Sequence, residues 1–253
     1  VLLFGLLLPV FSLYKNNKSL GKLFLIVAFI LFISASFNSN YNKDRKKPNI
    51  IIYVLDADKN EAYWASYNST VDAFTKQFLG ENPTRGSYDK DTTVSKYRTG
   101  IKLYAEAKIK NIPIPLIEVN YDTIINGNRN ISITITPQRN VNRIDVLAKN
   151  VIHFNQLDIN GISLSKKEGE KYVFDTGKNK TIISYYITNP NENIKLWLSI
   201  PKNETPQLTI SEVSYNLFKS TLFNLQKRDK NMIPTPFVIN DAIMVKKRIN
   251  LSK

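Results

Sequence analysis

The sequence predicts a mainly β protein, an antiparallel β-sandwich domain preceded by a transmembrane helical hairpin. Two long apolar runs open the chain, Val1–Tyr14 and Leu20–Phe37. After Pro48, short runs rich in β-branched residues alternate with turn residues at a spacing of about 8–12 residues, which is typical of sandwiches. Hydrophobic residues make up 43% of the chain, enough to form a core and to exclude a wholly disordered protein.

The N-terminal runs are interpreted as membrane segments because neither has a polar face of helical period, which a buried hairpin of a soluble protein would show. Val1–Tyr14 is shorter than the about 20 residues of a full span. The chain begins with Val and lacks the basic stretch that precedes the apolar region of a signal peptide. We therefore expect a fragment of a longer protein, with a hairpin at 1–37 whose first helix is truncated, a linker at 38–47 and an extracytoplasmic β-sandwich domain at 48–253.

The domain is expected to open with a hairpin, in which the strands Asn49–Leu55 and Ala62–Tyr67 flank a turn at Asp56–Asn60. A short helix is expected at Val71–Leu79, ended by Gly80, and then a polar loop at 86–99. Asn126-Gly127 predicts a second hairpin turn. The other expected strands are Ile101–Ile109, Leu116–Ile125, Arg129–Thr136, Arg143–Ala148, Val151–Ile159, Lys171–Phe174, Thr181–Thr188, Ile194–Ile200, Gln207–Val213 and Ala242–Ile249.

No residue of this chain is predicted to be catalytic, cofactor-binding or metal-binding. The sequence contains no cysteine and one histidine, His153, which excludes disulfide scaffolds, zinc fingers and sites with two histidine ligands. His153 lies within a predicted strand without a recognisable nucleophile pattern, so we expect a structural role. Asp56 and Asp58 resemble the start of a calcium loop, but the glycine and the final acidic residue are absent, which favours a simple turn.

The formal net charge is +14, and the cations are dispersed along the chain without an aromatic–basic motif. Nucleic acid is therefore not an expected partner, whereas a lipid bilayer is. The loop between the apolar runs carries Lys15, Lys18 and Lys22, and Lys43, Arg45, Lys46 and Lys47 follow the second run, so the cations alone do not choose an orientation.

Two stretches read PNIIIYVLDADKNEAYWASY, at Pro48–Tyr67, and NMIPTPFVINDAIMVKKRINL, at Asn231–Leu251. Together with PIPLIEV and NISITITPQRNVNRIDVL, they resemble the C-terminal region of membrane-bound M28-family metallopeptidases. The resemblance implies a zinc aminopeptidase domain first, then several transmembrane helices, then a β-rich extracytoplasmic domain. The zinc ligands of the family would lie in the preceding domain, and none of them corresponds to a position in this chain.

The resemblance thus implies a non-catalytic membrane anchor and accessory module of a zinc-dependent M28-like aminopeptidase. Its expected partners are the lipid bilayer, the peptidase domain and the remaining transmembrane helices. The sandwich would lie outside the cytoplasm, in the periplasm or an equivalent lumen. A stand-alone membrane-tethered binding or structural β-sandwich protein is the alternative.

Overall fold

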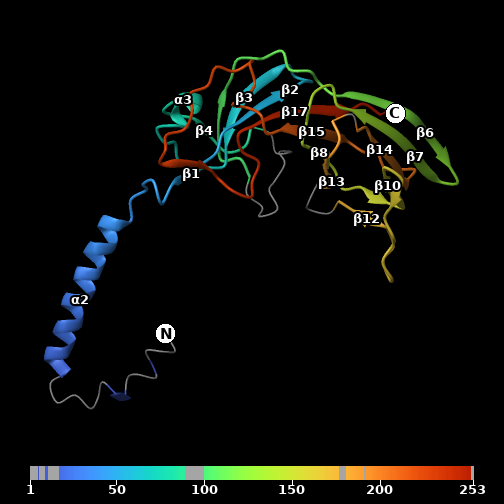
Figure 1. Ribbon diagram of the computed structural model, residues 1–253. Coiled ribbons are helices and arrows are strands. Elements are labelled where there is room, and N and C mark those ends of the chain that lie inside the picture. The colour runs from blue at the N-terminus through green and yellow to red at the C-terminus, as the bar shows by residue number, and fades with distance from the viewer. Residues whose placement is uncertain are drawn as a thin grey trace. The chain divides into compact units, whose positions relative to one another are not determined.

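The computed structural model describes residues 17–88, 100–176, 181–190 and 192–251, together with Gly5, Pro9 and Val10. The chain divides into two compact units, Val1–Lys47 and Pro48–Lys253. In the first unit, helix α2 spans Asn17–Asn38 (Figure 1). The second unit is mainly β and contains several sheets.

Helix α2 is long and apolar enough to cross a membrane. Its stretch Lys18–Asn38 has a mean hydropathy of 2.3, and none of it is buried inside the protein. Large side chains such as Leu25 and Phe32 are 72% and 73% exposed. The expected partner helix, Val1–Tyr14, lies almost entirely outside the described residues, so one apolar helix, rather than a hairpin, is supported.

The larger sheet has eight strands in the order β13-β8-β15-β17-β2-β3-β5-β4. Their bounds are Thr181–Tyr186, Arg143–Ala148, Leu208–Ser214, Ala242–Ile249, Ile52–Asp56, Glu61–Ser66, Leu103–Glu106 and Thr84–Arg85. The pairs are antiparallel except that β17 runs parallel to β2, with Ala242 opposite Ile52. This pair departs from the antiparallel expectation. All of β2 is buried, as in a strand covered on both faces.

The second sheet has five antiparallel strands in the order β11-β10-β14-β7-β6, with bounds Ile162–Ser163, Gln156–Ile159, Ile194–Pro201, Asn128–Thr136 and Leu116–Ile125. The predicted turn at Asn126-Gly127 joins β6 to β7 (green in Figure 1) and has φ angles of 50° and 77°. These left-handed values are the ones that Asn and Gly adopt most readily. A bulge interrupts β6 between Val119 and Tyr121.

Shorter elements complete the second unit. Strand β1, Lys47–Asn49, pairs with β16, Met232–Pro234, and β9, His153–Phe154, pairs with β12, Phe174–Asp175. Helix α3 is confined to Lys76–Leu79 instead of the expected 71–79. The first turn is missing because Asp72 Oδ1 accepts the N–H groups of Phe74 and Thr75, at 3.1 and 2.8 Å, in a local side-chain turn.

Three clusters form the core. One is shared by the two large sheets, with Ile131 and Leu196 from the five-stranded sheet against Ile144 and Ile210 from the eight-stranded sheet. The other two lie on opposite faces of β2, because alternate residues of a strand point to opposite sides. Tyr53 and Leu55 belong to one of them, and Ile52 and Val54 to the other.

The remaining expected strands differ mainly at their ends. Strands β8 and β17 have the predicted bounds. The expected strand Val151–Ile159 is divided between two sheets, since β9 pairs with β12 and β10 pairs with β14. The expected strand Ile101–Ile109 is reduced to β5, and Ile109 is 49% exposed. Most of the expected loop at 86–99 lies outside the described residues.

Candidate functional site

His153 is held by one carboxylate and one aromatic ring. Its Nδ1 lies 2.6 Å from Glu204 Oε1, and its backbone N–H donates to Glu204 Oε2 at 2.9 Å. The ring centroid lies 4.6 Å from that of Tyr172. Glu204 therefore positions both the ring and the strand, and in the part of the chain that the structure describes no hydroxyl group contacts the imidazole.

The acidic residues at the first hairpin of the domain form a turn, as predicted. Asp56 Oδ1 accepts the N–H groups of Asp58 and Lys59, at 3.2 and 3.1 Å, and Asn60 has a left-handed φ of 55°. Asp58 Oδ2 accepts the N–H of Arg248 at 2.6 Å. These oxygens stabilise the turn. Among the described residues, no group of three or more His, Asp or Glu side chains is arranged to hold a metal ion.

A buried polar cluster that the sequence reading missed lies across β13 and β8. Asp145 is fully buried, and its Oδ1 accepts hydrogen bonds from Arg143 Nε at 2.8 Å and from Ser184 Oγ at 2.5 Å. A visible signal was an aspartate within the apolar run RIDVLA. One partner, Arg143, lies in the same run two residues away, whereas the other, Ser184, comes from a strand 39 residues away, which the run itself does not indicate.

Glu212 forms a second buried cluster, on β15. Its Oε2 accepts Arg139 Nε at 3.1 Å, Arg139 Nη2 donates to the Glu212 carbonyl at 3.1 Å, and Arg139 Nη1 donates to Ser214 Oγ. Burial raises the pKa of Glu212 to about 7, although Arg139 opposes the shift. Burial also lowers the pKa of Arg139. A carboxyl group of this kind exchanges its proton near neutral pH, but Glu212 is fully buried and out of reach of a substrate.

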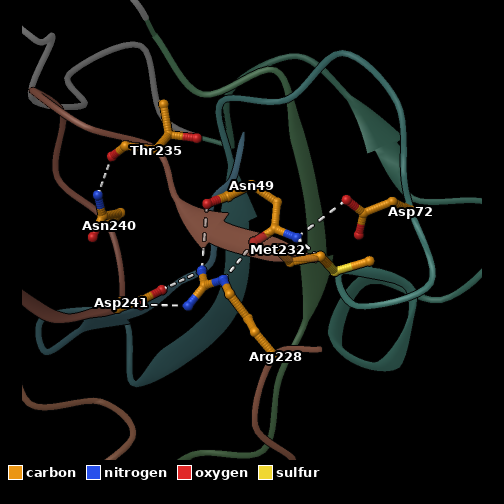
Figure 2. A network of polar contacts seen from close by, with 7 residues as sticks. All are labelled: Asn49, Asp72, Arg228, Met232, Thr235, Asn240 and Asp241. Carbon is orange, nitrogen blue, oxygen red and sulfur yellow. Dashed lines mark hydrogen bonds and ion pairs between the residues drawn. The ribbon is translucent and has the colours of Figure 1, made fainter. Parts of the chain in front are cut away.

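Arg228 is the centre of a third network, shown in Figure 2. Its guanidinium group donates to both carboxylate oxygens of Asp241 and to the side-chain and backbone oxygens of Asn49. Asn49 Nδ2 in turn donates to Asp72 Oδ2 at 3.2 Å. The guanidinium carbon lies 4.4 Å from the ring centroid of Phe74. The network thus ties β1, the segment before α3 and the approach to β17 together.

A small surface cleft lies beside α3. It has a volume of about 280 Å³, just below the range for small-molecule sites. Its lining combines apolar, polar and charged side chains and consists of Ser69, Thr70, Val71, Glu81, Asn82, Pro83, Arg85 and Leu103. Lys76 Nζ lies 2.7 Å from Glu81 Oε1, so that carboxylate is already paired. The cleft offers no arrangement of an acid, a base and a nucleophile.

In comparisons with protein families and with curated proteins, no match to this sequence was found. The polar clusters of the described residues join separate strands and loops. Among the described residues, the apolar helix α2, which precedes the β-rich unit in the sequence, is the feature with the clearest functional implication.

Proposed function

We propose that this chain is the membrane anchor and accessory β-sandwich module of a zinc-dependent M28-like aminopeptidase, and that it is itself non-catalytic. Helix α2 would cross the bilayer, and the β-sandwich would lie outside the cytoplasm beside the peptidase domain. Zinc would be bound by that peptidase domain and not by this chain.

The observation that carries the membrane assignment is the complete exposure of α2. A 21-residue apolar stretch, Lys18–Asn38, has no buried residues, whereas the core helix of a soluble protein would be covered. Leaving side chains such as Phe29 and Leu31 in water would forgo roughly 1.5–3 kcal/mol for each one. A lipid environment accounts for this surface.

The peptidase assignment is supported by the contacts between the two sequence stretches that resemble M28-family proteins, Pro48–Tyr67 and Asn231–Leu251. Strand β2 belongs to Pro48–Tyr67 and β17 belongs to Asn231–Leu251, and these strands pair in parallel from Ala242–Ile52 to Lys246–Asp56. Asn49 and Asp241, one from each stretch, also bind the same guanidinium group, that of Arg228. Two segments far apart in the sequence thus form one structural unit, as expected if they are the signature of one domain.

The non-catalytic assignment is supported by the contacts of the buried carboxylates, which are bound by neighbouring side chains. Asp145 is held by Arg143 and Ser184, and Glu212 by Arg139. These groups fix strands to one another inside the core, at positions that a substrate does not reach.

The membrane assignment is tested by expressing the full chain and extracting the membranes with alkaline carbonate. We expect the wild-type chain to stay in the pellet at its full mass. The double variant Ile26→Asp, Ile30→Asp should be extracted, because each buried charge near the centre of a span costs about 2.5–3.5 kcal/mol. Lys43→Gln, which lies after α2, serves as a control outside the apolar stretch. A product cleaved after Phe37 would identify α2 as a signal sequence and contradict the anchor.

The non-catalytic assignment and the peptidase assignment need separate measurements. The purified full chain should hydrolyse no aminoacyl substrate with added zinc, and elemental analysis after dialysis should find no stoichiometric zinc. Stoichiometric zinc that is lost in His153→Ala would overturn the non-catalytic assignment. If the open reading frame upstream of Val1 encodes paired His and carboxylate zinc ligands, the peptidase assignment gains support. If it encodes an unrelated domain, the stand-alone binding module replaces it.

A further inference from the structure

The outward face of the five-stranded sheet carries an aromatic row that the proposed function does not use. Tyr121 on β6 is opposite Ser132 on β7, and Ser132 is opposite Trp197 on β14, which is opposite Asp158 on β10. Opposed residues of neighbouring strands point to the same side of a sheet. Their chain neighbours, such as Ile131 and Leu198, are in the core, so this row points away from it.

The two rings of the row are partly exposed and have no aromatic partners among the described residues. Tyr121 is 39% exposed, and Trp197 is partly exposed. In the described part of the chain, neither ring stacks on another aromatic ring or lies beneath a cation. The second tryptophan, Trp64, packs against three other aromatic rings, those of Tyr53, Phe78 and Phe223. Trp197 is therefore the tryptophan available to a ligand.

The spacing of the strands that carry the two rings suits a chain of sugar residues. One strand, β7, separates β6 from β14. The backbones that carry Tyr121 and Trp197 are therefore about 10 Å apart, twice the spacing of neighbouring strands. A disaccharide unit has a similar length, and the C–H face of a pyranose packs on an aromatic ring as other apolar groups do.

The groups around the rings are hydroxyls and amides. The partly buried Asn130 and the buried Ser199 lie in the next row of the same face, and the buried Thr134 lies on its other side. Asn120 Nδ2 donates to Thr134 Oγ1 at 2.8 Å, and Gln156 Nε2 donates to Asp158 Oδ2 at 3.0 Å. The exposed amides of Asn120 and Gln156 can donate to and accept from the adjacent hydroxyls of a sugar.

The small net charge of this face favours a neutral ligand. Its charged side chains in the paired rows are Glu118, Asp158 and Lys195, a net charge of −1, on a chain whose formal net charge is +14. A face that bound phosphate groups of nucleic acid or lipid would concentrate the cations. We propose that the outward face of the five-stranded sheet binds a neutral oligosaccharide chain, with Trp197 and Tyr121 as stacking platforms.

The proposal does not depend on the peptidase or the membrane assignment, and it is tested on the full chain. The protein is purified in dodecyldimethylamine oxide, a detergent without a sugar headgroup, and titrated with hexasaccharides of glucose (α- and β-linked), xylose, mannose and N-acetylglucosamine. Calorimetry gives the affinity, and tryptophan fluorescence reports on Trp197. We expect at least one hexasaccharide to bind, and Trp197→Ala and Tyr121→Ala each to weaken it about tenfold or more.

Two controls separate ligand binding from stability. Tyr186→Ala removes an exposed tyrosine, 60% accessible, from the eight-stranded sheet and should leave the affinity unchanged. Trp197→Phe keeps a stacking ring and should retain most of the binding, while thermal unfolding followed by circular dichroism confirms that each variant is folded. Failure of every hexasaccharide to bind overturns the proposal, as does binding that is unchanged in both alanine variants. A change of oligomeric state in Trp197→Ala without sugar binding would assign the face to a contact between copies instead.

Discussion

Trp64 is packed more closely than any exposed ring of the domain. Its ring centroid lies 5.2 Å from that of Tyr53, 5.0 Å from that of Phe78 and 5.8 Å from that of Phe223. Truncation would leave a cavity among rings that cannot all move, so we expect Trp64→Ala to lower the free energy of unfolding by about 3 kcal/mol. Urea titration measures the loss. Trp197→Ala is the matched control and should lose less than half as much; equal losses would contradict the packing assigned to Trp64.

Glu212 makes the free energy of unfolding depend on pH, and the protein is expected to lose stability as the pH rises. Its pKa is raised from 4.5 in the unfolded chain to about 7 in the folded protein. The folded state therefore holds this proton more tightly than the unfolded chain does. The stabilisation is complete below about pH 4.5 and is lost as the pH rises through about 7, and it amounts to about 3 kcal/mol in all.

Glu212→Gln isolates this effect, because the amide has the same shape and no proton to lose. Its carbonyl oxygen can still accept the hydrogen bond of Arg139. We expect the difference in unfolding free energy between wild type and variant to shift against the wild type by about 2–3 kcal/mol between pH 5 and pH 8. Urea titrations at the two pH values measure it, and a difference that stays constant would show that Glu212 keeps an ordinary pKa.

At this scale, sequence reasoning found residues whose partners are local and missed those whose partners are distant. The turns at Asp56–Asn60 and Asn126-Gly127 were predictable because their chemistry is contained within a few residues. Arg139 and Glu212 are 73 residues apart, and Arg228 and Asn49 are 179 apart. An arginine in a loop gives no indication of which carboxylate or carbonyl it will reach.

At the scale of the elements, Arg228 joins β1, the segment before α3 and the approach to β17. The guanidinium group binds Asp241, whose φ is 50°, and both oxygens of Asn49, while its face covers Phe74. Arg228→Ala should lower the free energy of unfolding by about 3 kcal/mol, because it leaves the partly buried Asp241 carboxylate without its cation.

Two further variants separate charge from geometry at this junction. Arg228→Lys keeps the charge but cannot bind Asp241 and Asn49 as a planar fork, so it should recover less than half of the loss. Asp241→Asn keeps a residue that tolerates the left-handed backbone and should lose less than Arg228→Ala. Urea titration of the three variants gives the order. Full recovery by lysine would mean that the network acts only through charge.

Helices and strands were predictable where the pattern of apolar residues in the sequence matches the burial of the element in the fold. The continuous apolar run Asn49–Leu55 predicts a strand, and β2, Ile52–Asp56, forms most of it and is buried along its whole length. The parallel pairing of β2 with β17 was not predictable, since it joins segments about 190 residues apart and depends on the whole sheet. The helix at 71–79 was overestimated because Asp72 and Thr75 form side-chain turns that a pattern of apolar positions does not register.

On the scale of the molecule, the three core clusters draw their buried residues from Ile50 to Ile249, all in the second unit. A fragment of residues 43–253 should therefore fold without detergent and show a single cooperative thermal transition. Circular dichroism and size-exclusion chromatography measure this. A fragment that aggregates until α2 is restored would show that the β-rich unit depends on the apolar segment for its stability.

The last prediction concerns the side of the membrane on which the β-rich unit lies. Lys15, Lys18 and Lys22 lie close together in the sequence at the N-terminal side of the apolar residues 23–37, where the preference of cations for the cytoplasm is strongest. A folded domain is translocated largely regardless of its own charge, so the four cations at Lys43–Lys47 weigh less. We therefore expect everything after α2 to lie outside the cytoplasm, and protease added to intact spheroplasts to digest the β-rich unit. Replacing Lys15, Lys18 and Lys22 by glutamine should weaken that preference and leave part of the chain protected. Complete protection of the wild-type chain, with digestion only after lysis, would reverse the orientation, and it would also contradict the proposed association with an extracytoplasmic peptidase.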